Sequence, residues 1–200
     1  MKDRYRLLAP VYTTISRLVF GDLIHQATTC YLSKIPNKSV IIIGGGKGMD
    51  FVPYQKELNG EYWELSSSML SRARVNLSKS DLKFRLGDFS TEDSQKFQLA
   101  ILPFVLDTMT DGQIIQFLNS LKMKISTDGQ VLVSDFYQSQ SVKHKLIQRL
   151  MITFFQLLTS HSRGDLPQME ELMNECGFQL LEEKSWKKGW IKAQVYTRKD

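Results

Sequence analysis

The first residues with chemical potential are a run of glycines behind an apolar segment. Val40 to Ile43 are all apolar, and the segment Gly44–Gly48 that follows is glycine except for Lys47. Glycine is needed where the backbone takes a positive φ or where a ligand approaches the main chain closely. A buried strand that ends in such a loop and opens a helix presents backbone N–H groups to a ligand. We therefore expect a ligand site at this loop.

The spacing of these glycines excludes two common phosphate-binding patterns. A dinucleotide fingerprint that starts at Gly44 requires glycine or alanine at position 49, where Met49 stands. A phosphate loop requires serine or threonine after its Gly-Lys pair, whereas Gly48 follows Lys47. The remaining G-x-G-x-G pattern, with its middle glycine at Gly46, is equally compatible with a plain turn between a strand and a helix.

A carboxylate in the next strand candidate adds a second signal. Glu64 lies near the end of the segment Glu61–Leu65, within one βαβ unit of Gly44. A carboxylate at this position can accept hydrogen bonds from both hydroxyls of a ribose. Burying a carboxylate without a partner is unfavourable, so a Glu flanked by apolar residues is expected to have one. The alternative is a surface glutamate at the tip of a strand.

The elements that must position these residues alternate between strand-like and helical patterns. The strand candidates are Ser39–Ile43, Glu61–Leu65, Leu82–Leu86, Leu99–Phe104 and Gln130–Asp135. The helical stretches between them are Met49–Leu58, Ser67–Leu77 and Asp111–Lys122. Apolar strands separated by helices of about ten residues are typical of a parallel sheet covered on both faces. The predicted fold class is therefore α/β, with a Rossmann-like doubly wound sheet.

The two ends of the chain depart from this alternation. Residues 3–33 have a helical pattern, and Gln168–Glu175 is a helix that Gly177 ends. Phe178–Trp186 and Trp190–Arg198 then predict a hairpin, so a mostly parallel, seven-stranded sheet finishes with an antiparallel pair. We expect a single domain over 1–200, made of a helical cap (1–36), a cofactor-binding core (37–138), a helical substrate-side insertion (139–165), and a helix with the hairpin (166–200).

In this order, the motifs resemble those of class I S-adenosylmethionine-dependent methyltransferases. Gly44–Gly48, Glu64-Leu-Ser-Ser-Ser-Met-Leu70 and Gly87-Asp88-Phe89 resemble the first three motifs of that family, and Leu99–Met109 and Asp128–Phe136 resemble its fourth and fifth strands. Leu8-Ala9-Pro10-Val11-Tyr12 is similar to a segment of the ubiquinone/menaquinone-biosynthesis type. The resemblance covers nearly the whole chain and implies a Rossmann-like methyltransferase with S-adenosyl-L-methionine as its cofactor.

The resemblance implies roles for residues at the adenosine end of the cofactor. Glu64 would bind the ribose, and Leu65 would pack on the adenine. Met69 would close that pocket. Asp88 would accept a hydrogen bond from the adenine amino group, while Phe89 would donate its backbone N–H to the ring.

At the methionine end, the resemblance implies mainly backbone and apolar contacts. The backbone of Gly44, Gly45 and Gly46 would lie under the methionine part. Leu102 and Pro103 would line the amino-acid end, and Tyr12 would fold over the cofactor from the amino-terminal helices.

The sequence also departs from the family pattern. Ile42 stands where the family often has an acid, so the contact with the cofactor's amino group is expected to be missing or moved. The family patterns have Asp at two further positions, which are Thr13 and Gln98 in this chain, and His at a third, which is Asp107. The motif for amino-group methylation on bases is absent. A degenerate, non-catalytic module that binds the cofactor is therefore an alternative.

The sequence does not identify a catalytic base. An electrophilic methyl group on sulfonium needs an in-line nucleophile about 3 Å away, and an oxygen or nitrogen nucleophile can also need a base. Asp107 follows the fourth strand and Tyr137 follows the fifth, so both are candidates. The alternative for Asp107 is a cap on the helix that begins near Asp111, and His161 fits a solvated loop.

The acceptor is best interpreted as a small molecule. The segment Val142–Leu158 is unusually apolar, which indicates burial against the sheet or a partner subunit, or an apolar substrate if it faces a cleft. A net charge of +5 permits an RNA or protein substrate, but the basic residues are spread along the chain, so nucleic acid is not favoured. Met49 argues against the other enzyme class considered, a nicotinamide-dependent oxidoreductase.

The remaining features indicate a cytoplasmic protein without a metal. Cys30 and Cys176 have no metal-like spacing and are interpreted as reduced thiols of a cytosolic protein. The longest apolar stretch, Leu150–Leu158, is far shorter than the roughly twenty residues of a membrane span. We expect a monomer or a homodimer.

Overall fold

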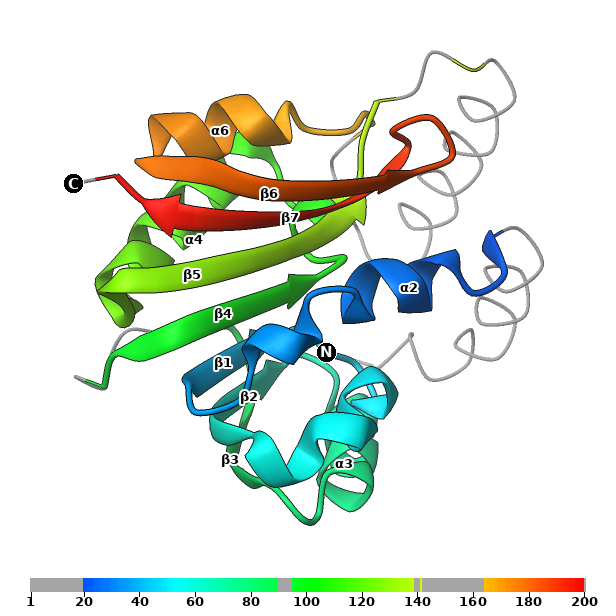
Figure 1. The fold of residues 1–200 in the computed structure, drawn as a ribbon, viewed down its shortest axis with the longest axis vertical. Helices are drawn as coiled ribbons and strands as arrows, with labels where there is room; N and C mark the ends of the chain where they lie inside the picture. The colour runs from blue at the N-terminus through cyan, green and yellow to red at the C-terminus, as the bar shows by residue number, and fades with distance from the viewer. Residues whose placement is uncertain (1–19, 90–94, 139–140, 142–163, 200) are drawn as a thin grey trace.

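Seven strands form one mixed sheet in the computed structural model, which describes residues 20–89, 95–138, 141 and 164–199. The strands are β1 (Ser39–Ile43), β2 (Asn59–Glu64), β3 (Asp81–Leu86), β4 (Phe97–Pro103), β5 (Ile125–Phe136), β6 (Phe178–Trp186) and β7 (Ile191–Arg198). Their order is β3-β2-β1-β4-β5-β7-β6. Strands β1 to β5 are parallel, and β7 is antiparallel to both of its neighbours (Figure 1). The predicted fold class is confirmed, including the antiparallel hairpin.

Helical elements pack on both faces of this sheet. One layer contains α2 (Leu23–Thr29), η1 (Leu32–Lys34), η2 (Met49–Glu57) and α3 (Ser67–Asn76). The other contains α4 (Asp111–Lys124) and α6 (Met169–Glu175), with η3 (Leu106–Thr108) joining β4 to α4. Within β1, Val40 and Ile42 pack into the first layer while Ile41 and Ile43 pack into the second. Because both faces are covered, the central strand is apolar throughout rather than alternating.

Two elements differ from the prediction. The stretch Met49–Leu58 is a 3₁₀ helix over Met49–Glu57, with Pro53 inside it. Proline has no N–H to donate, and its ring clashes with the carbonyl four residues earlier, so a regular α-helix is disfavoured there. The strand predicted over Gln130–Asp135 begins earlier, at Ile125. Its first residues were not predicted to be a strand because several of them are polar and exposed.

The cap and the insertion of the predicted domain organisation are described only in part. The insertion at 139–165 and the first part of the cap at 1–36 lie mostly outside the described residues. Of the cap, α2 and η1 are described, and the Ser134 hydroxyl of β5 donates to the carbonyl of Ala27 in α2 at 2.8 Å. In the part of the chain that is described, no helix has the length and apolar character needed to cross a membrane.

Candidate functional site

The glycine loop (Gly44–Gly48) leaves β1 at the carboxyl edge of the sheet. The backbone N–H of Gly44 donates to the carbonyl of Trp63 in β2 at 2.8 Å, so the loop starts as a continuation of the sheet. Gly44, Gly46 and Gly48 have φ values of 74°, 61° and 72°, a region that side chains with a Cβ rarely adopt. The alternate spacing of the glycines therefore reflects a real backbone requirement.

The atoms around each glycine show which positions of the loop are closely packed and which border open space. A Cβ added to Gly44 would lie 2.3 Å from Cγ2 of Val105, and one added to Gly45 would lie 2.4 Å from the hydroxyl of Tyr62. A Cβ added to Gly46 would meet no atom of the described residues within 4 Å. The first two glycines are thus required by the protein's own packing, whereas Gly46 borders space that a ligand can enter.

Tyr62 of β2 supports the glycine loop with its hydroxyl, a role that was not predicted from the sequence. Its side chain is fully buried, and its hydroxyl donates to the carbonyl of Gly46 at 3.1 Å. Burial raises the pKa of Tyr62 well above its usual value, and the carboxylates of Glu64 and Asp50 raise it further. The hydroxyl therefore stays protonated and able to donate. The available signal was a tyrosine in an apolar strand, two residues before the candidate carboxylate.

Glu64 bridges the glycine loop and the start of α3. One carboxylate oxygen accepts from the N–H of Gly46 at 3.0 Å, and the other accepts from the N–H of Ser66 at 2.9 Å. The side chain is half-buried. This confirms the expectation that the carboxylate has partners. A carboxylate accepts hydrogen bonds from hydroxyl donors as well as from N–H groups.

The adjacent strand ends bring further predicted residues to the same edge. Strands β2 and β3 are parallel neighbours, and the N–H of Gly87 donates to the carbonyl of Glu64 at 3.1 Å. Leu65 is 68% exposed and Asp88 is also exposed. Met69 is half-buried in the first turn of α3. Glu64, Leu65 and Asp88 thus share one rim of the sheet, next to the open side of the loop.

Two predicted residues direct their side chains into the core instead. The Phe89 ring packs edge-on against Trp63, with centroids 5.8 Å apart. Leu102 is fully buried among the residues under α4. The Leu102 side chain therefore cannot face a ligand, and the Phe89 ring is partly covered by Trp63. Pro103 is half-buried at the end of β4, and Tyr12 lies outside the described residues.

The turn after β4 is held by a fully buried carboxylate. One oxygen of Asp135 accepts from the N–H groups of Leu106 and Asp107 at 3.1 and 3.2 Å, and the other accepts from Phe136 at 2.8 Å. Burial raises the pKa of Asp135 well above its usual range, and the Asp107 carboxylate raises it further. Thr110, not Asp107, is the N-cap of α4. The alternative of Asp107 as a helix cap is therefore wrong.

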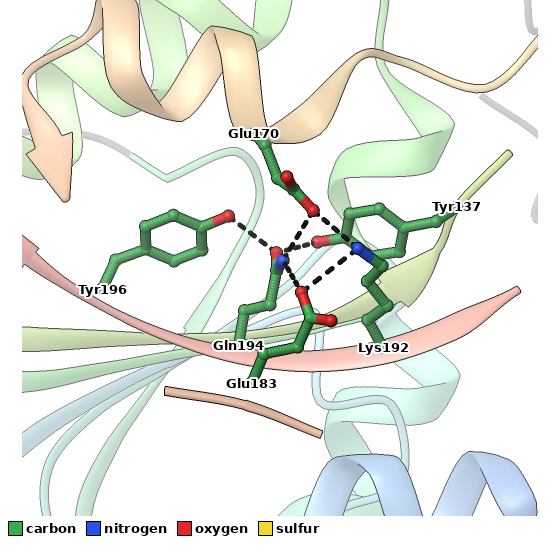
Figure 2. Close-up of polar contacts among 6 residues, drawn as sticks. All are labelled: Tyr137, Glu170, Glu183, Lys192, Gln194 and Tyr196. Carbon is green, nitrogen blue, oxygen red and sulfur yellow. Dashed lines mark hydrogen bonds and ion pairs between the residues drawn. The ribbon is translucent and has the colours of Figure 1, made fainter. Parts of the chain in front are cut away.

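Tyr137, the other candidate base, is part of a buried polar network (Figure 2). Its hydroxyl and that of Tyr196 both donate to the side-chain oxygen of Gln194. The side-chain nitrogen of Gln194 donates to Glu170 at 3.0 Å and to Glu183 at 2.7 Å. Burial raises the pKa of Tyr137 well above its usual value. A phenol that is buried and bound in this way is suited to a structural role.

No metal centre is found in the described ranges, where no group of three or more His, Cys, Asp or Glu side chains is arranged to hold an ion. His25 of α2 contacts Asp50 of η2 at 2.5 Å, and both side chains are partly exposed. This pair joins the cap to the segment just after the glycine loop. Cys30 and Cys176 are free thiols.

Comparison with known proteins gives matches in structure alone. No family model matches the chain, and neither does any curated protein. The mitomycin 7-O-methyltransferase MmcR matches with a TM-score of 0.68 at 17% identity, over 88% of this chain and 52% of its own. The fold is that of the class I methyltransferases.

Two further solved structures share this class I fold. CalO1, a methyltransferase in calicheamicin biosynthesis in its S-adenosylhomocysteine-bound form, matches with a TM-score of 0.63 at 17% identity, over 97% of this chain and 59% of its own. A TehB-like methyltransferase from Corynebacterium glutamicum matches with a TM-score of 0.61 at 13% identity, over 98% and 95%. The chain thus spans 52% of the mitomycin enzyme's length but nearly all of the TehB-like protein's.

Proposed function

We propose that the chain binds S-adenosyl-L-methionine and transfers its methyl group to a small, apolar molecule. The observation that carries this proposal is the carboxylate of Glu64 beside the open side of Gly46. The site lies where the strand order reverses, between β1 and β4, and open α/β sheets bind their ligands at such a point. The bound S-adenosylhomocysteine of the CalO1 structure supports the choice of cofactor.

The residues at this edge fit the adenosine end of the cofactor. The carboxylate of Glu64 would accept hydrogen bonds from the ribose hydroxyls, and Leu65 offers an exposed apolar surface for the adenine. Asp88 and the backbone of Phe89 follow at the neighbouring strand end. The bound cofactor supplies an electrophilic methyl group on its sulfonium. This chain's residues orient it and exclude water around it.

An aromatic cluster favours an apolar acceptor. Phe136 ends β5, and its ring lies 5.1 Å from the rings of Phe20 and Phe104 and 6.0 Å from that of Trp190. Phe104 follows β4, and Trp190 comes just before β7, whose first residue pairs with Phe136. The cluster therefore lies at the carboxyl edge, and the half-buried Phe104 is its most accessible member.

Asp107 is the residue we propose as base if the acceptor atom is oxygen or nitrogen. It lies in η3 at the carboxyl edge and is half-buried, whereas the side chain of Tyr137 is buried. An acceptor of the ubiquinone/menaquinone-precursor type is our finer proposal. It is supported by the segment Leu8–Tyr12 and by the aromatic cluster.

The test of this activity is transfer of a radiolabelled methyl group from the cofactor into a cell extract. We expect label in the organic-soluble fraction, because the proposed acceptor is small and apolar. Label in protein or RNA would instead support a macromolecular acceptor. Binding of the cofactor without any transfer would support a non-catalytic module.

A further inference from the structure

The turn that follows β4 is wound in a way that needs external support. Phe104 has a φ of 55°, an uncommon conformation for a residue with a bulky side chain. Such conformations are unfavourable and persist where the surrounding structure holds them. The N–H of Phe104 donates to the carbonyl of Ser134 in β5 at 2.7 Å. The end of β5 is thus the first support for this turn.

Asp135 supplies the second support. Its side chain has no exposed surface and accepts N–H groups from both sides, two from η3 and one from its own strand. The donors in η3 are Leu106 and Asp107, directly after Val105. These two bonds fix where the turn begins relative to β5. A neutral amide of the same shape has only one acceptor oxygen for the same three donors.

Val105 connects this turn to the glycine loop. A Cβ added to Gly44 would lie 2.3 Å from Cγ2 of Val105, so Val105 leaves no room for a side chain at this position. Val105 is half-buried and lies at the start of η3, in the turn that follows β4. The spacing between the two loops that leave β1 and β4 is therefore set by the contact of Val105 with Gly44, and Asp135 maintains it through hydrogen bonds to the two following residues.

We infer that Asp135 is a positioning residue for the methionine end of the cofactor, acting through Val105 and Gly44. This inference rests on the proposed function. Gly44 and the turn after β4 bound the methionine side of the proposed site, whereas Glu64 and Leu65 bound the adenosine side on β2. Asp135 therefore affects the recognition of the aminocarboxypropyl group and leaves recognition of adenosine unchanged.

The test compares two ligands on the same variants by calorimetric titration. S-adenosylhomocysteine carries the aminocarboxypropyl group, and 5′-methylthioadenosine lacks it. For Asp135→Asn we expect an affinity about tenfold weaker for S-adenosylhomocysteine, as for the loss of one buried hydrogen bond. The affinity for 5′-methylthioadenosine should stay within about twofold. Asp81→Asn, an exposed carboxyl at the opposite edge of the sheet, is the matched control and should change neither.

If Asp135→Asn loses the same affinity for both ligands, or loses affinity for neither, the positioning role of Asp135 is overturned. A merely structural residue does not change the ratio of the two affinities. If Asp135→Asn does not fold, Val105→Ala decides the question, because it removes the contact with Gly44 and leaves the buried hydrogen bonds in place. Val105→Ala should weaken the affinity for S-adenosylhomocysteine and leave the affinity for 5′-methylthioadenosine unchanged. Failure of the wild-type protein to bind S-adenosylhomocysteine would contradict the proposed function instead.

Discussion

Individual hydrogen bonds to backbone groups shape the candidate site more than its exposed side chains do. Tyr62 holds the carbonyl of Gly46, Glu64 holds the N–H of the same residue, and Asp135 holds the turn after β4. Each of these side chains lies on a strand and reaches a loop. The loops are therefore fixed by the sheet before any ligand binds.

Removing the hydroxyl of Tyr62 tests this support. Tyr62→Phe should lower the free energy of unfolding by about 1 kcal/mol, the usual net value of one hydrogen bond. Urea unfolding measures the change. Tyr54→Phe is the matched control, because the hydroxyl of the half-buried Tyr54 makes no hydrogen bond to the described residues. Equal effects of the two substitutions would show that the bond to Gly46 contributes nothing.

The buried carboxyl of Asp135 predicts a pH dependence of stability. Its pKa is raised in the folded state, so the folded protein binds the proton more tightly than the unfolded chain does. This contribution to stability is present at and below the ordinary Asp pKa of about 4, and it is lost as the pH rises through the folded-state pKa. The Asp107 carboxylate faces it and disfavours its ionisation, and Asp135 in turn raises the pKa of the neighbouring Tyr137 phenol.

Urea midpoints at several pH values above 4, measured for the wild-type protein and for Asp135→Asn, check this sign. The stability of the wild-type protein should fall with rising pH relative to the variant, since the variant has no carboxyl to ionise. A difference between the two proteins that stays constant with pH, or that reverses, would contradict the raised pKa.

Part of this detail is predictable from sequence and part is not. The spacing of Gly44 and Glu64 predicted the loop and a partnered carboxylate, because strand ends and glycine conformations are local properties. The bonds from Tyr62 to Gly46 and from Asp135 to η3 join residues 16 and 28 to 29 positions apart. Such contacts depend on which strands lie next to each other, which the pattern of one strand does not contain.

At the scale of elements, the carboxyl-terminal hairpin is joined to α6 and to the end of β5 by the polar network around Gln194. This residue is fully buried, and both ends of its amide are used, with two phenols on the oxygen and two carboxylates on the nitrogen. Lys192 contacts the same two carboxylates, Glu170 and Glu183, at 2.6 and 3.1 Å. The network fixes the register of β7 against its neighbours.

Gln194→Leu should lower the free energy of unfolding by about 2–4 kcal/mol, because it leaves the two buried phenols without their acceptor. Adding Tyr196→Phe to this variant should recover part of the loss, since it removes one of the orphaned hydroxyls. In the wild-type background, Tyr196→Phe should be destabilising. Urea unfolding of the four proteins forms the cycle, and the same sign for Tyr196→Phe in both backgrounds would contradict it.

The elements themselves were predicted with different success for physical reasons. Apolar strands covered on both faces, such as β1, are evident because nearly every residue, here Val40 to Ile43, is apolar and buried. The segment Met49–Glu57 was misassigned as an ordinary helix, since its apolar spacing is helical but Pro53 favours the 3₁₀ form. The first half of β5 was missed because its exposed residues are polar.

For the whole molecule, the strand order places the glycine loop, Glu64, Leu65 and Asp88 at one edge of the sheet. Strand order β3-β2-β1-β4-β5 puts the glycine loop beside Glu64 on one side and beside Val105 on the other. The same order brings the aromatic cluster to the ends of β4 and β5. The position of the proposed site is therefore a consequence of topology, with its proposed adenosine side on β2 and β3 and its proposed reacting side on β4 and β5.

The central claim is tested most directly by calorimetric titration of S-adenosylhomocysteine into three proteins: wild type, Glu64→Ala and Glu57→Ala. Glu57 is an exposed carboxylate at the end of η2, just before β2 begins, and serves as the control. We predict that the wild type and Glu57→Ala bind alike, while Glu64→Ala loses about 1.5–3 kcal/mol of binding free energy with its hydrogen bonds to a charged acceptor. No binding by the wild type, or unchanged binding by Glu64→Ala, would contradict the account.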